Sequence, residues 1–133
     1  MYMVQQQYLA QWHDNFVEYI RQLLSFVDGY MLLPQATEDN KIELLKVRTI
    51  LTGKDVENIE ANLADGAKRG VLKKSTIDKI VKLDKDLLDF ALERISIDSF
   101  WKNFLRQLSI IRIEQAKDAT ITRLNELHIP VIE

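Results

Sequence analysis

Residues 9–30 read LAQWHDNFVEYIRQLLSFVDGY, and the spacing of their apolar side chains decides the fold class. Apolar residues recur at steps of three and four, which places them on one side of a helix. They are Leu9, Trp12, Phe16, Tyr19, Ile20, Leu23, Phe26, Val27 and Tyr30. The spacing predicts a helix from about Gln5 to Val27 or Tyr30. We expect it to fray at Asp28-Gly29, because glycine favours helix ends.

The composition favours a globular protein made of helices. Four glycines and two prolines in 133 residues are less than half the usual share of about 12%, so few tight turns are expected. Hydrophobic residues make up 47% of the chain and charged residues 29%, which excludes a disordered chain. We therefore expect an all-α fold in a single domain over residues 1–133. It would be a bundle of four to five helices, with long first and last helices and short middle helices.

The second and third helices are predicted from a cap and a glycine. Thr37 can cap a helix that ends near Leu51, because its hydroxyl can accept the free backbone N–H groups of the first turn. The expected apolar face of that helix consists of Ile42, Leu45, Val47 and Ile50. Gly53 marks its end, and a short third helix begins at either Thr52 or Asp55.

Two further helices complete the predicted bundle. Ser75, with Asp78 three residues later, indicates the start of the fourth helix. Lysines alternate with aspartates, Asp84 among them, on the face of that helix that we expect to be solvated. The last helix is predicted from about Ser99 to His128, where Ile129-Pro130 stops it. The apolar tail 129–133 either packs back on the bundle or reaches a neighbouring subunit as an extended arm.

The first and last predicted helices are long for a chain of this size. At 1.5 Å per residue they would span about 35–45 Å, whereas a compact chain of this length has a radius of gyration of about 14 Å. Either the two helices cover each other, or part of their apolar surface is covered by another chain. Aromatic residues anchor protein interfaces well, because they bury a large area. The candidate interface residues are Tyr8, Trp12, Phe16, Trp101 and Phe104.

These features favour a non-enzymatic interaction or assembly protein. Such a protein would either form a homo-oligomer or bind a protein partner. The alternative is a helical subunit associated with nucleic acid. The net charge of −2 and the pI of about 5.7 argue against an attraction of the whole molecule to nucleic acid. A basic loop could nevertheless contact a phosphate backbone as part of a larger complex. Its candidate contacts are Lys68, Arg69, Lys73 and Lys74.

The sequence gives little support for catalysis or for a bound cofactor or metal. The chain has no cysteine, which excludes disulfides, thiolate metal sites and cysteine nucleophiles. A di-iron bundle needs Glu-x-x-His pairs, and neither His13 nor His128 has a glutamate three residues before it. The N-terminal residues lack the pattern of a secretory signal, and no apolar run approaches the ~20 residues of a membrane span. A cytoplasmic location is therefore expected.

Residues 123–128, Arg123-Leu124-Asn125-Glu126-Leu127-His128, have the spacing Arg-x4-His. This segment resembles the motif of HEPN-type helical ribonucleases. The resemblance implies that Arg123 and His128 would meet at a dimer seam, activate a ribose 2′-hydroxyl and stabilise the developing phosphate charge. Leu124 departs from the polar residue that usually follows the arginine. The competing interpretation is a histidine placed favourably at the C-terminal end of a helix dipole.

Overall fold

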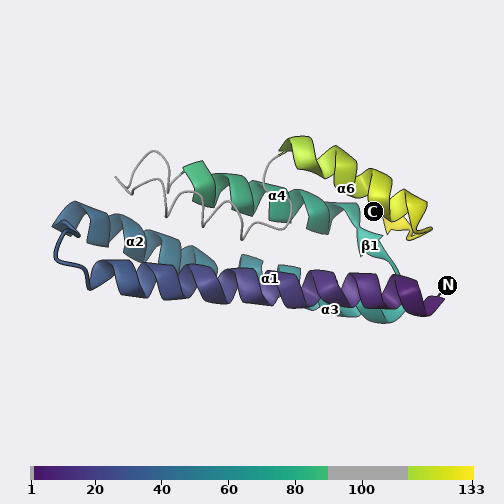
Figure 1. Ribbon diagram of the computed structural model, residues 1–133, viewed down its shortest axis with the longest axis horizontal. Coiled ribbons are helices and arrows are strands. Elements are labelled where there is room, and N and C mark those ends of the chain that lie inside the picture. The colour runs from purple at the N-terminus through teal and green to yellow at the C-terminus, as the bar shows by residue number, and fades with distance from the viewer. Residues whose placement is uncertain (1, 90–113) are drawn as a thin grey trace.

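The computed structural model describes residues 2–89 and 114–133, and their fold is all-α (Figure 1). The helices are α1 (Tyr2–Met31), α2 (Glu38–Leu51), α3 (Lys54–Arg69), α4 (Lys74–Asp89) and α6 (Glu114–Glu126). Two short strands, β1 (Leu72–Lys73) and β2 (Val131–Ile132), pair in parallel. The predicted fold class and the long first helix are confirmed. Asp28-Gly29, however, does not fray, because α1 continues to Met31.

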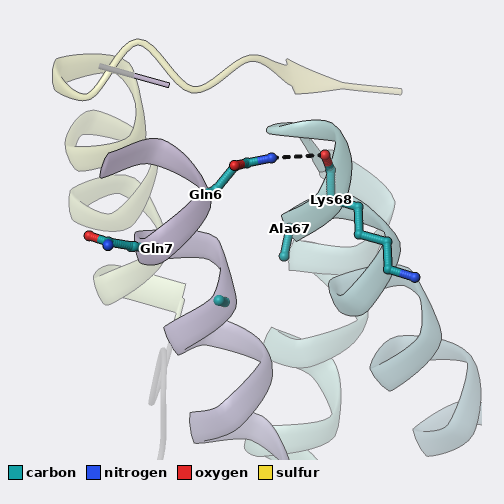
Figure 2. A pocket seen from close by; sticks show the side chains of 5 residues that line it. Gln6, Gln7, Ala67 and Lys68 are labelled. Carbon is teal, nitrogen blue, oxygen red and sulfur yellow. Dashed lines mark hydrogen bonds between the residues drawn. The ribbon is translucent and has the colours of Figure 1, made fainter. Parts of the chain in front are cut away.

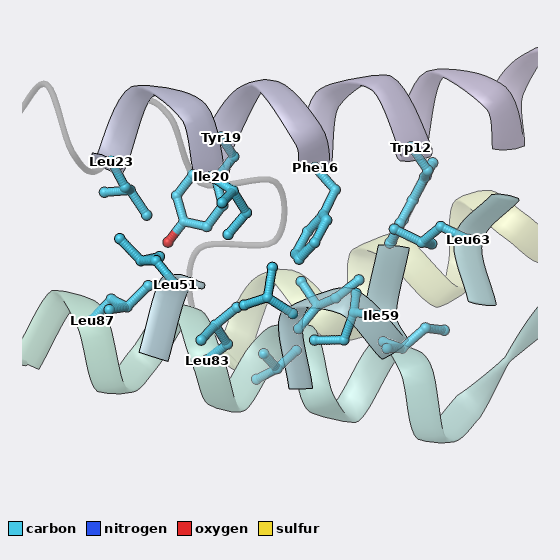
Figure 3. Packing of buried hydrophobic residues seen from close by; sticks show 14 of the residues in the cluster. Trp12, Phe16, Tyr19, Ile20, Leu23, Leu51, Ile59, Leu63, Leu83 and Leu87 are labelled. Atoms are coloured by element: carbon cyan, nitrogen blue, oxygen red, sulfur yellow. The ribbon is translucent and has the colours of Figure 1, made fainter. Parts of the chain in front are cut away.

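Helix α1 is the axis around which the other described helices pack. Its 30 residues correspond to a length of about 45 Å. Helices α2 and α3 return along it one after the other, and α4 lies on another side (Figure 1). Figure 3 shows α1 side chains pointing toward Ile59 and Leu63 of α3 and toward Leu83 and Leu87 of α4. The apolar stripe of α1 therefore forms the centre of the core.

The boundary between α2 and α3 follows from local backbone chemistry. Thr37 caps α2 as predicted: its hydroxyl accepts the N–H of Asn40, whose side chain in turn accepts the N–H of Thr37. Such a capping box satisfies two backbone donors that the first turn leaves free. Thr52 ends α2, and Gly53 is the N-cap of α3. The third helix thus begins at Lys54, between the two predicted starts.

The turn from α3 to α4 requires glycine at two places. Gly70 has a φ of 71°, in the left-handed region that glycine adopts most easily, and its N–H donates to the carbonyl of Gly66. A Cβ added to Gly66 would lie 2.5 Å from the carbonyl oxygen of Val71. The chain then enters β1 and continues directly into α4 at Lys74, so Ser75 lies within the first turn and is not the N-cap.

The C-terminal tail packs on its own chain. β2 pairs with β1, Leu72 opposite Val131, and the Leu72 N–H donates to the Pro130 carbonyl. The Gln5 side chain donates to the carbonyls of Leu127 and His128, which ties the beginning of α1 to the end of α6. The predicted start of the last helix at Ser99 lies outside the described residues. Among the helices of residues 2–89 and 114–133, none combines the length and apolar character needed to cross a bilayer.

Candidate functional site

The aromatic stripe of α1 is core rather than surface. Trp12 and Phe16 are buried against the returning helices (Figure 3). Tyr8 is partly buried against the same cluster. Trp101 and Phe104 lie outside the described residues. The opposite side of α1 is polar: Glu18 accepts two hydrogen bonds from the Arg21 guanidinium and one from Gln22. These hydrogen bonds lower the pKa of Glu18, and the bond from Arg21 has the largest effect.

A buried polar pair joins α1 to α4. The Tyr19 hydroxyl donates to Asp84 Oδ1 over 2.7 Å, and the two residues are only 3% and 1% exposed. The prediction of a solvated Asp84 is therefore wrong. Burial, together with the neighbouring carboxylate, raises the pKa of Tyr19 well above its ordinary value of 10. The sequence carries a signal for this site, because Asp84 occupies the same helical stripe as Ile80 and Leu87.

Helix α2 turns three of its four expected core residues toward solvent. Val47 is buried as predicted, and Leu44 and Leu51 are buried with it. Ile42, Leu45 and Ile50 are 53%, 52% and 46% exposed. At 100° per residue these three lie on one side of α2, with Lys46 and Thr49 between them. We call the five residues Ile42, Leu45, Lys46, Thr49 and Ile50 the α2 outer face.

The polar members of the α2 outer face are satisfied within their own helix. The Lys46 ammonium pairs with Glu43 Oε1 at 3.1 Å, and the Thr49 hydroxyl donates to the Leu45 carbonyl at 3.0 Å. The opposite side of α2 is held to α1 by the bond from Arg48 Nε to Asp28 Oδ1, 3.0 Å long. The α2 outer face is thus fixed in orientation, and it needs no further hydrogen-bond partner.

Charged side chains lie at both ends of the α2 outer face. Glu38 and Asp39 form the acidic first turn of α2. Lys54 lies at the other end, where α3 begins. Glu38 pairs weakly with Lys41 at 3.4 Å, whereas Asp39 and Lys54 form no ion pair with any residue in 2–89 or 114–133. The α2 outer face therefore has an acidic first turn at one end, whereas at the other end Lys54 is accompanied by Asp55 and Glu57 in the first turn of α3.

The four basic residues singled out in the sequence lie on the two sides of the Gly70 turn. Lys68, Arg69 and Lys74 are exposed, and Lys73 is partly buried in β1. Arg69 is paired with Asp65 at 3.2 Å. Lys73 and Lys74 make no ion pair within the described part of the chain. We call these four residues the basic turn.

A shallow groove of about 370 Å³ lies beside the basic turn, between α1 and α3 (Figure 2). It is lined by Gln6, Gln7, Ala10, Ala67 and Lys68. The Gln6 amide closes one end of it by donating to the Lys68 carbonyl at 3.1 Å (Figure 2). The two alanines make the groove mostly apolar, and Lys68 is the charged residue among those that line it.

In the Arg-x4-His segment, the Arg123 side chain is paired within α6, whereas His128 is contacted at its backbone carbonyl. Arg123 Nη1 is held by Glu126 Oε2 at 3.2 Å. His128 follows the end of α6 with a φ of 58°, and its carbonyl accepts from Gln5. Within the described residues, no group of three or more His, Cys, Asp or Glu side chains is placed to hold a metal ion.

Known proteins give no guide to the function, so its assignment rests on the residues themselves. No protein-family model, curated protein or solved structure matches the chain. The sequence identifies the residues of the basic turn, but its patterns predict neither the Tyr19–Asp84 pair nor the solvent exposure of the α2 outer face.

Proposed function

We propose that the protein is a non-enzymatic assembly protein that self-associates through the α2 outer face. The observation that carries this proposal is the exposure of Ile42, Leu45 and Ile50 on one side of one helix. The aromatic stripe of α1, the expected interface, is already covered by the same chain at Trp12 and Phe16. The proposal therefore assigns the contact to the middle of the chain. Exposed aliphatic side chains that share a face are typical of surfaces that bind protein.

The strength of the association can be estimated from the burial that remains available. Fully burying an aliphatic side chain contributes about 1.5–3 kcal/mol to the free energy of association. Ile42, Leu45 and Ile50 are about half exposed, so about half of this contribution remains available at each residue. Over two copies of the face the gain is about 4–9 kcal/mol. Association costs at least about 4 kcal/mol. At the upper end of the burial range, the gain exceeds the cost of association by about 5 kcal/mol, which corresponds to a Kd of about 0.2 mM. We therefore expect a weak, concentration-dependent oligomer.

Molar mass in solution tests this proposal. Light scattering should show the mass rising above 15.5 kDa as the protein approaches about 1 mM. The double variant Ile42→Lys/Ile50→Lys should remain a monomer, because it replaces the apolar contact with charge at exposed positions. Gln11→Lys, on the exposed polar side of α1, is the matched control and should behave as the wild type. A wild-type protein that stays monomeric over the whole series would contradict the proposal.

A second candidate function is contact with nucleic acid at the basic turn. It is favoured by the gathering of Lys73 and Lys74, which have no ion-pair partner within the described residues, beside Lys68 and Arg69. Four phosphate contacts would give a slope of log K against log salt of about −3 for a single strand and about −4 for a duplex. Replacing Lys73 and Lys74 with glutamine should remove about half of that slope. Failure of an oligonucleotide to bind at low salt would eliminate this candidate.

A further inference from the structure

We draw no further inference here: the strongest candidate, the apolar pocket of about 260 Å³ beside Phe26, Gly29 and Tyr30 at the end of α1, carries nothing, because nothing in the part of the chain that the structure describes shows what occupies it.

Discussion

The hydrogen bond between Tyr19 and Asp84 offers the sharpest test of how α1 and α4 are held together. Tyr19→Phe removes the hydroxyl that donates to Asp84 Oδ1 over 2.7 Å and leaves the ring in place. Because the ring is retained, no cavity forms, and the change acts on the hydrogen bond alone. The carboxylate is 1% exposed, so water cannot readily replace the lost donor. We therefore expect Tyr19→Phe to be destabilising.

The magnitude follows from the type of bond. A hydrogen bond to a charged group contributes about 1.5–3 kcal/mol to the free energy of unfolding. For 133 residues the unfolding entropy is about 0.28 kcal/mol/K, so this loss corresponds to a fall in Tm of about 5–11 °C. Tyr30→Phe is the matched control: Tyr30 is also a buried tyrosine of α1, and no hydrogen bond of its hydroxyl is formed within the described residues. Its effect should stay below about 0.5 kcal/mol.

Urea unfolding at several pH values measures the loss of stability in Tyr19→Phe and shows whether that loss comes from the Tyr19 hydroxyl. The pKa of Tyr19 is raised in the folded protein, so the stabilisation is complete below pH 10 and declines as the pH rises above 10. The decline is about 1.4 kcal/mol per pH unit, because only the unfolded chain releases this proton. Tyr19→Phe should lose that part of the alkaline slope. A variant within 0.5 kcal/mol of wild type at neutral pH, as expected of ordinary surface substitutions, would refute the reasoning.

Three further substitutions test a helix cap, a helix interior and a close backbone approach at a turn. Thr37→Ala removes the capping box of α2 and should lower the free energy of unfolding by about 1 kcal/mol in urea titration; an unchanged midpoint would contradict the role of the cap. Gly29→Ala should stabilise α1 by about 0.5–1 kcal/mol, because a Cβ there meets nothing within 4 Å. Gly66→Ala should destabilise by about 1–3 kcal/mol, because its Cβ would clash with the Val71 carbonyl. Equal effects of the two glycine substitutions on Tm would contradict the close approach at Gly66.

The parts of the fold that follow from local patterns could be predicted. The stripe from Leu9 to Tyr30 has helical spacing over many turns, so helix α1 was predicted correctly, apart from its continuation through Gly29. Thr37 was recognised as a cap because its chemistry is local. The Gly70 turn was located by its glycine, and its cations were identified with it.

The orientation of α2 could not be predicted, and the reason is specific. Leu44, Val47 and Leu51 form one apolar stripe, while Ile42, Leu45 and Ile50 form another on the opposite side of the helix. Periodicity identifies a helix with apolar residues, but it does not say which of two stripes meets α1. The choice depends on packing against other elements, including the bond from Arg48 to Asp28. The second stripe is left for solvent.

The Tyr19–Asp84 pair was missed because aspartate among lysines normally indicates a solvated face. Asp84 is in the apolar stripe of α4, between Ile80 and Leu87, and only a partner on another helix makes burial there acceptable. That partner is 65 residues away in the sequence. The position of Asp84 within the apolar stripe is the local signal of burial, but neither helix carries a local signal that identifies the partner. Charge patterning alone therefore gave the wrong environment for Asp84.

Methyl NMR over a concentration series tests the central claim most directly. Samples of the full chain, labelled at isoleucine and leucine methyl groups, would be compared from about 0.05 to about 2 mM, a range that includes the estimated Kd. Resonances of Ile42, Leu45 and Ile50 should move with concentration, while those of Leu44 and Leu51, buried against α1, should stay fixed. Spectra in which the three outer methyl groups keep their positions over the whole series would contradict the account.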